Sequence, residues 1–138
     1  MSPEDSRPVR LLHEALTHDI IGCFYRVHRE LGFGYRERLY SLALERELME
    51  SGHRVARETA VMVYYRGRPL AWQRLDMIAD GKVVIEVKAS ALLPADATAQ
   101  LFSYLCATDL EVGLLLHFGR EPRFYRVISE NRLRTPGS

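Results

Sequence analysis

Glu86 and Lys88 stand two residues apart within an otherwise apolar segment, residues 83–89. In an extended strand, residues two apart point to the same face, so this carboxylate and this ammonium group would lie side by side. A charge in so apolar a strand must be paired or must bind a metal ion. The spacing therefore predicts a site at which an acid and an amine act together.

Asp76 would add a second carboxylate if the turn before this strand has the right length. The preceding segment reads as one arm of a β-hairpin with an Asp-Gly turn signal. A two-residue turn would point Asp76 away from Glu86. A three-residue loop, residues 79–81, would instead pair Asp76 with Val84 and place Asp76, Glu86 and Lys88 on one face. We predict this loop or an equivalent bulge.

Two carboxylates and a lysine that converge suit a divalent cation, because hard cations prefer oxygen ligands. The amine would position water or a phosphate. Of the 19 basic residues, 17 are arginine, and only Lys82 and Lys88 are lysine. An ammonium group is a compact charge whose pKa can fall on burial, whereas a guanidinium group needs more room. Lysine at position 88 is therefore either a chemical requirement or chance.

Another acidic candidate lies in the first turn of the helix predicted for residues 36–51. Gly34, Glu37 and Tyr40 follow one another at three-residue steps, which places them on one stripe of a helix. Glu37 would stabilise this helix through its dipole, and that role alone would explain the residue. The alternative is that Glu37 reaches over the sheet and acts as a third acidic ligand.

Gln100 and Tyr104 stand one turn apart in the helix predicted for residues 94–108, which Pro94 would open. One interpretation is an ordinary amphipathic helix face. The other is that the amide and the hydroxyl group hold a phosphate or order the water near Lys88.

Hydrophobic periodicity predicts elements in the order ααβββαββ, an α/β fold with a mixed sheet. The expected helices are residues 11–31, with a restart near Thr17 as an alternative, 36–51 and 94–108. The expected strands are one within residues 53–65, followed by residues 70–79, 83–88, 112–118 and 124–128. Residues 112–118 are almost wholly apolar, which is typical of a fully buried strand.

The composition is that of a soluble globular protein, and 138 residues suffice for one domain with a buried core. No apolar run approaches the length of a membrane span and no signal peptide is evident, so we expect a cytoplasmic protein without a membrane partner. The two cysteines lack metal-ligand spacing and are expected to be reduced.

The formal net charge of +1 does not point to nucleic acid, but it leaves room for a local basic groove. Candidate phosphate contacts in such a groove, each of which could equally be an ordinary solvated residue, are Arg66, Arg68, Arg74, Arg120, Arg123 and Arg126.

Asp76 followed by Glu86-Val87-Lys88 is similar to the signature of the PD-(D/E)xK nuclease superfamily. More closely, the chain resembles the small bacterial GxxExxY family within that superfamily. Five blocks carry the resemblance in that family's order, between residues 12 and 128: residues 30–40, 74–76, 84–89, 100–105 and 113–119.

The resemblance implies a restriction-endonuclease-like αβββαβ core with a mixed sheet of four to five strands between helices. It also implies a Mg²⁺- or Mn²⁺-dependent nuclease whose substrate is nucleic acid, with DNA expected rather than RNA. In that nuclease the metal would be bound by Asp76, Glu86 and Glu37, and the attacking water would be positioned by Lys88. The substrate would be positioned by Gln100, Tyr104 and Tyr40.

Two positions depart from the family pattern. His117 stands where asparagine is expected, and Tyr35-Arg36 replaces an apolar pair; neither change falls on a proposed ligand. The competing hypothesis is a catalytically silent module that binds nucleic acid or protein on the same fold. A homodimer is the alternative to a monomer.

Overall fold

The computed structural model describes residues 13–129 and confirms the order of elements expected from the sequence. The helices are α1 (Glu14–Leu31), α2 (Glu37–Glu50) and α3 (Ala97–Cys106), and the strands are β1 (Val55–Tyr65), β2 (Arg68–Ala79), β3 (Val83–Lys88), β4 (Val112–Phe118) and β5 (Pro122–Ile128). Within residues 13–129, no helix is both long and apolar enough to cross a membrane.

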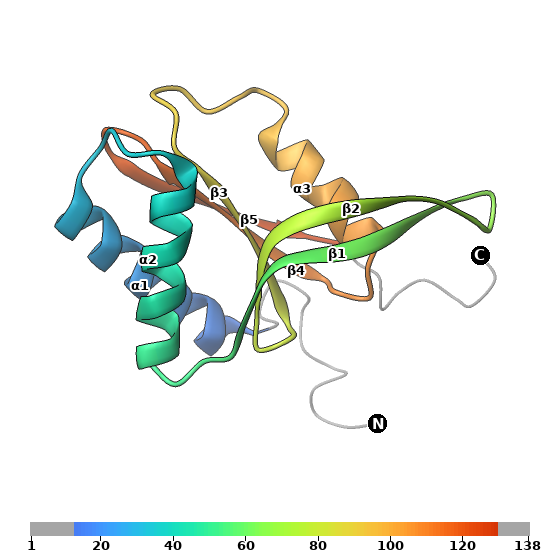
Figure 1. Ribbon diagram of the computed structural model, residues 1–138, viewed down its shortest axis with the longest axis horizontal. Helices are drawn as coiled ribbons and strands as arrows, with labels where there is room; N and C mark the ends of the chain where they lie inside the picture. The colour runs from blue at the N-terminus through green and yellow to red at the C-terminus, as the bar shows by residue number, and fades with distance from the viewer. Residues whose placement is uncertain (1–12, 130–138) are drawn as a thin grey trace.

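The five strands form one mixed sheet in the order β1-β2-β3-β4-β5, with helices on its two faces (Figure 1). β3 and β4 run parallel, and every other neighbouring pair is antiparallel. Every residue of β4 is buried. A parallel strand inside a sheet is covered on both faces, which explains why its sequence does not alternate between apolar and polar residues.

Alternate residues of β3 contribute to two separate core clusters. Ile85 and Val87 belong to the cluster that α1 and α2 cover, whereas Val84 belongs to the cluster that α3 covers. Because neighbouring residues in a strand point to opposite faces, Glu86 and Lys88 lie on the α3 side of the sheet.

Three aromatic rings lie in the cluster beneath α1 and α2. Phe118 of β4 stacks on Tyr40 of α2 with 4.3 Å between ring centroids, and it meets Phe24 of α1 edge-on at 4.8 Å. The Tyr40 hydroxyl group donates a hydrogen bond to the Gly32 carbonyl and accepts one from the Tyr35 N–H at 3.3 Å. Tyr40 therefore fixes the loop that joins the first two helices.

Tyr40→Phe is expected to lower the free energy of unfolding by about 1–2 kcal/mol, because the ring stays packed while both hydrogen bonds of its hydroxyl group are lost. Urea denaturation followed by circular dichroism measures the change. Tyr25→Phe is the matched control, since Tyr25 is 42% exposed on α1; it should stay within about 0.5 kcal/mol of wild type. Equal losses in the two variants would contradict the role given to the Tyr40 hydroxyl group.

Two helices differ from the expected boundaries. α1 continues through Thr17 without a restart, since the Thr17 hydroxyl group donates to the Glu14 carbonyl at 3.0 Å and is satisfied inside the helix. α3 begins at Ala97 rather than at Pro94, because the Ala97 N–H bonds to the Pro94 carbonyl at 3.1 Å and closes a separate turn first.

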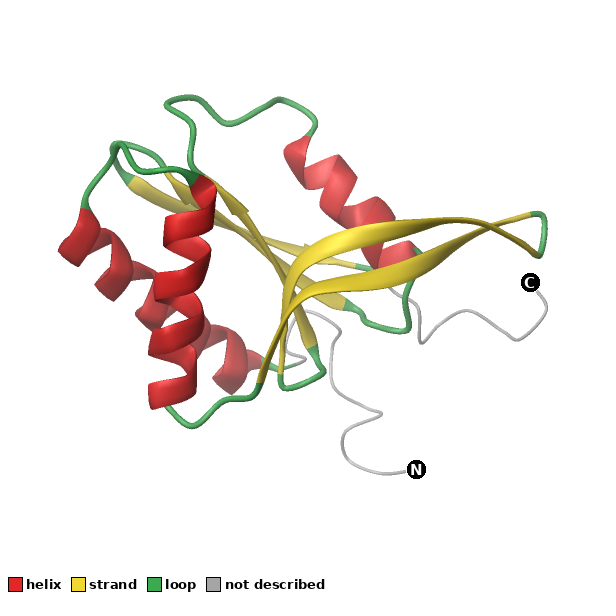
Figure 2. Ribbon diagram, in the orientation of Figure 1, coloured by secondary structure: helices red, strands yellow, loops and turns green. Residues whose placement is uncertain are grey.

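β1 and β2 form a long hairpin that projects beyond the rest of the sheet (Figure 2). β2 pairs with β1 from Arg68 to Ala79, but it pairs with β3 only at residues 77–79. Residues 59–75 of the hairpin therefore have no third strand beside them, and we call this part the hairpin arm.

Candidate active site

The β2–β3 turn decides which way Asp76 points. Ala79 is the last paired residue of β2, and the loop consists of residues 80–82, one residue later than expected. The predicted pairing of Asp76 with Val84 is therefore wrong, since Val84 pairs with Ile78, and the same register extended by one pair would put Asp76 opposite Glu86. The residue opposite Asp76 differs from the predicted one by two positions, and a shift of two residues leaves the side chains of Asp76, Glu86 and Lys88 on their predicted faces.

The regular ladder between β2 and β3 stops at Met77 and Ile85, immediately before the two carboxylates meet. The Asp76 carboxylate Oδ2 accepts a hydrogen bond from the Val87 N–H at 2.7 Å, and Glu86 Oε1 accepts one from the Asp76 N–H at 3.3 Å. Side-chain oxygens thus accept hydrogen bonds from one backbone N–H of each strand at the point where the ladder stops. The two strands separate here, and the carboxylates occupy the opening.

β2 also turns about its own axis at Asp76. Leu75 and Met77 are two residues apart and would share a face in a regular strand, yet Leu75 packs in the α3 cluster and Met77 in the opposite one. On the other side of β2, Glu58 of β1 has a φ of 55°, which is unusual for a residue other than glycine. The β1–β2 pairing skips Glu58 opposite Asp76, whose side chain reaches the Val87 N–H of β3.

Glu86 carries the strongest electrostatic perturbation near this opening. Its side chain is 7% exposed, and burial together with the charge of Asp76 raises the pKa of Glu86 to about 8, although Lys88 opposes the shift. Burial favours the neutral acid, and two carboxylates in contact disfavour double ionisation. The charge of Lys88 thus does not offset the cost of ionising both carboxylates, and a divalent cation would supply the additional positive charge.

α3 brings a phenol to the same place. The pKa of Tyr104 is raised by burial and then by the charges of Glu86 and Asp76, so its hydroxyl group lies within electrostatic reach of both carboxylates. Gln100 stands one helical turn earlier with an exposed side chain. The structure thus places Tyr104 within electrostatic reach of the pair and Gln100 on the same helix at the surface.

Lys88 ends β3 half-buried, and its charge acts on Glu86. In the parallel ladder Lys88 lies beside His117, which is 5% exposed and whose Nε2 is 2.7 Å from the Ser90 carbonyl oxygen. His117 therefore positions the chain that follows Lys88. This role has one signal in the sequence, namely a histidine where the family pattern has asparagine.

A family model described as the PD-(D/E)XK nuclease superfamily matches residues 14–127. The chain belongs to the PD-(D/E)XK nuclease superfamily. Nucleases of this superfamily generally use divalent metal ions, and their name implies a nucleic-acid substrate.

The crystal structure of SSO0001 is similar to this chain, with a TM-score of 0.56 and 23% sequence identity. The similarity covers 67% of this chain and 49% of the other, so the chain spans about half the length of that structure. At this identity the comparison supports the fold alone. Among curated proteins, none matches the chain in sequence.

The opening between β2 and β3 lies within the matched residues 14–127. The residues predicted to be the two acids and the lysine of the signature, Asp76, Glu86 and Lys88, lie at this opening, and their roles stay predictions. The Leu75 side chain is fully buried in the α3 cluster and anchors β2 directly before Asp76.

Glu37 and Tyr40 lie on the helix that covers the opposite face of the sheet. Glu37 is the exposed first residue of α2. Across residues 13–129, no three His, Cys, Asp or Glu side chains lie together as a metal site, so the structure joins Asp76 to Glu86 without Glu37. Tyr40 has no exposed surface, and any effect on substrate would pass through the loop it holds. Their roles as third ligand and substrate contact stay predictions.

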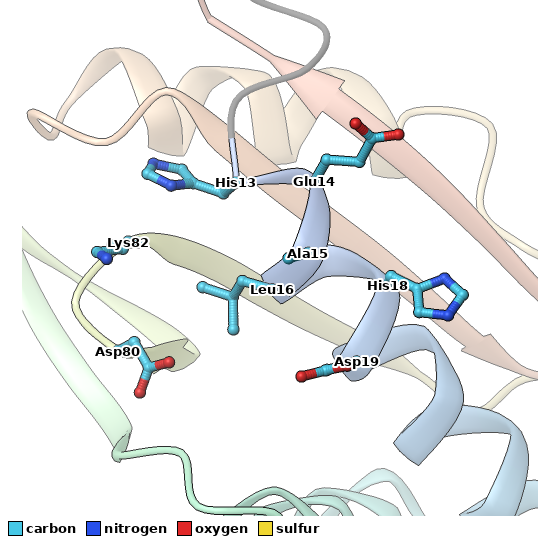
Figure 3. A pocket seen from close by; sticks show the side chains of 8 residues that line it. All are labelled: His13, Glu14, Ala15, Leu16, His18, Asp19, Asp80 and Lys82. Carbon is cyan, nitrogen blue, oxygen red and sulfur yellow. The ribbon is translucent and has the colours of Figure 1, made fainter. Parts of the chain in front are cut away.

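A cleft of about 680 Å³ lies elsewhere, between the start of α1 and the β2–β3 turn (Figure 3). None of the predicted site residues lines it. At its edge Asp80 accepts hydrogen bonds from His53 Nδ1 and from the Arg54 N–H, both at 2.8 Å, while His53 Nε2 lies 3.3 Å from Asp19. These contacts tie the turn to α1 and hold the start of β3 in register.

Proposed function

We propose that this superfamily member is a Mg²⁺- or Mn²⁺-dependent nuclease that hydrolyses phosphodiester bonds, with DNA as its substrate. The observation that carries the proposal is the contact of Asp76 with Glu86 where β2 and β3 separate, with the charge of Lys88 acting on the pair. Such a pair is costly to ionise fully without a cation. A divalent cation would meet this need, and the same cation would bind the phosphate of a nucleic acid.

Asp76 and Glu86 would hold the cation, with Glu37 proposed as a third acidic ligand. Mg²⁺ is typically held by one or two carboxylates together with water and substrate phosphate, so the two adjacent carboxylates suit it. When bound, the cation supplies Lewis-acid polarisation of the phosphate and lowers the pKa of a water molecule.

The remaining roles belong to groups on β3 and α3. Lys88 would orient the attacking water and offset the negative charge that develops on the phosphate. The Val87 N–H holds Asp76 in place through its 2.7 Å hydrogen bond. Tyr104, within electrostatic reach of the carboxylates, would donate its hydroxyl hydrogen to a phosphate oxygen, and Gln100 at the surface would bind the neighbouring nucleic-acid backbone.

Within the superfamily we assign the chain to the GxxExxY family. Gly34, Glu37 and Tyr40 lie where the loop between α1 and α2 enters the second helix. Gly34 has a φ of 123°, which favours glycine, and Tyr40 closes this loop through the Gly32 carbonyl. The spacing of the motif thus matches a local structural requirement.

Asp76→Asn is expected to abolish metal-dependent cleavage, with a loss of about 10²-fold or more, because the cation loses a charged ligand while the side-chain shape is kept. The assay follows mixed DNA and RNA substrates in Mg²⁺, Mn²⁺ or EDTA. In parallel, Mg²⁺ should raise the melting temperature of wild type but not of Asp76→Asn. Asp109→Asn is the matched control, since Asp109 is exposed in the loop after α3.

Two outcomes would overturn the proposal. Equal melting shifts in wild type and Asp76→Asn would remove the metal ion from this site. Binding of nucleic acid without cleavage under either metal would identify the alternative, a catalytically silent binding module on the same fold.

A further inference from the structure

We propose that the hairpin arm, residues 59–75, binds a single-stranded segment of nucleic acid and guides it toward the carboxylate pair. The inference rests on the proposed function for the nature of the ligand. It concerns a different surface, because Asp76 and Glu86 lie at the base of the hairpin and the arm projects away from the sheet (Figure 2).

The arm exposes large apolar side chains close to one another in sequence and pairing. Tyr64 is 62% exposed, Tyr65 58%, Leu70 65% and Trp72 69%. Tyr64 and Tyr65 are neighbours on β1 and therefore point to opposite faces, so both sides of the arm carry exposed apolar side chains. Several large exposed apolar side chains on one short segment are typical of an interaction site. Three of the four are aromatic, so the surface can stack on flat partners such as bases.

The charge of the arm has one sign. Arg66, Arg68 and Arg74 lie within it, and no aspartate or glutamate occurs in residues 59–75. The whole protein has a net charge of only +1, so the positive charge is concentrated here relative to the rest of the chain. The guanidinium group of Arg66 lies 5.3 Å from the centre of the Tyr65 ring. Arginines beside aromatic rings suit a nucleic acid, because the arginines can bind its phosphates while the rings stack on its bases.

The arm is pre-organised for such contacts. Its turn is formed by Arg66 and Gly67, with φ values of 52° and 76°, as in the tight turns that match the twist of a hairpin. At its base, Val61 and Leu75 pack against the α3 cluster. Trp72 pairs with Met62, the neighbour of Val61 on β1. Since neighbouring residues of a strand point to opposite faces, Trp72 lies on the outer face, away from the α3 cluster.

The arm also leads to the proposed reaction centre. Trp72, Arg74 and Asp76 are spaced two residues apart on β2. At about 3.3 Å per residue, Trp72 stands roughly 13 Å along the strand from Asp76. A strand that stacks on Trp72 and pairs a phosphate with Arg74 would therefore approach Asp76 within a few nucleotides, at the point where β2 turns from its outer face toward the α3 side that carries Glu86 and Lys88.

A single strand fits these features better than a second copy of the chain. A two-fold pairing of two arms would bring the same surface against itself, and three arginines would face three arginines without a carboxylate between them. Unpaired bases offer their faces for stacking, whereas the bases of a duplex are already stacked on one another. Exposed rings beside arginines thus favour unpaired nucleotides.

Trp72 is the only tryptophan of the chain, so its fluorescence reports directly on the arm. A 15-nucleotide thymidine strand, titrated in EDTA, is expected to quench this fluorescence and to bind at least tenfold more tightly than a 15-base-pair duplex. Trp72→Ala, followed by anisotropy of a labelled strand, should bind about 5- to 150-fold more weakly. Arg66→Gln/Arg68→Gln should reduce the slope of log affinity against log salt by about 1.4.

The matched control is Arg29→Gln/Arg46→Gln, which removes two exposed arginines from α1 and α2 and should leave the slope within about 0.3 of wild type. The inference would be overturned if the two double variants reduced the salt slope equally, or if the duplex bound more tightly than the single strand. It would also be overturned if the wild type were a dimer that Trp72→Ala dissociates while strand binding stays unchanged. Because EDTA prevents metal-dependent cleavage, a failed binding test leaves the nuclease assay unaffected. Conversely, a protein without cleavage can still pass the binding test.

Discussion

Lys88→Ala is expected to reduce the rate of phosphodiester cleavage by about 10²- to 10⁴-fold, the usual contribution of a positioned acid–base group. Lys88 lies half-buried at the end of β3, and its charge already acts on Glu86. Its removal takes away the group that would orient water while leaving the carboxylates in place. Binding of nucleic acid should therefore survive.

The chain supplies its own control for this experiment. Lys82 is the only other lysine and lies exposed in the β2–β3 turn, outside the carboxylate pair. Lys82→Ala should cleave at the wild-type rate, as measured by single-turnover kinetics with saturating Mg²⁺. Lys88→Arg should restore little activity, because a planar guanidinium group needs more room than an ammonium group. A Lys88→Ala protein that cleaves normally would exclude lysine from the reaction.

Glu86→Gln is expected to make the metal-free protein more stable than wild type at alkaline pH. The folded-state pKa of Glu86, about 8, lies above its ordinary value of 4.5, so the folded state binds more protons than the unfolded state between these values. The stability that comes from the neutral acid is present below pH 4.5 and is lost as pH rises through about 8. The loss is on the order of a few kcal/mol, since each pKa unit corresponds to about 1.4 kcal/mol, and glutamine avoids it.

Urea denaturation in EDTA at several pH values between 5 and 9 measures this difference. Glu50→Gln, at an exposed position at the end of α2, should keep the wild-type dependence on pH. In wild type, added Mg²⁺ should stabilise more strongly as pH rises, because the cation and the proton compete for the same carboxylates. Parallel pH profiles of wild type and Glu86→Gln would show that Glu86 ionises in the fold without cost.

Sequence patterns predicted the elements of the fold well where one physical signal dominated. The apolar run of residues 112–118 could only be a covered strand, and α1 and α2 followed from apolar residues at helical spacing. Boundaries were less certain where a turn competes with the helix, as at Pro94, whose carbonyl closes a separate turn before α3 begins.

The register of the β2–β3 hairpin was predicted incorrectly by two positions at Asp76, although the loop length of three residues was expected. The turn signal Asp80-Gly81 fits either loop, and the observed loop is selected by contacts from elsewhere in the chain, namely the hydrogen bonds of Asp80 with His53 and the Arg54 N–H. The side-chain faces survived this error because a shift of two residues preserves the alternation.

By itself, the sequence determined which groups could do chemistry: Asp76, Glu86 and Lys88, spaced so that the last two share a strand face. Only the tertiary structure decided which groups meet. The kink of β2 at Asp76 and the end of its ladder with β3 bring the two carboxylates into contact, whereas Tyr40 is drawn into the core by its stacking on Phe118. The reason is that local spacing fixes the direction of a side chain within one element, while distances between elements depend on how separate parts of the chain pack together.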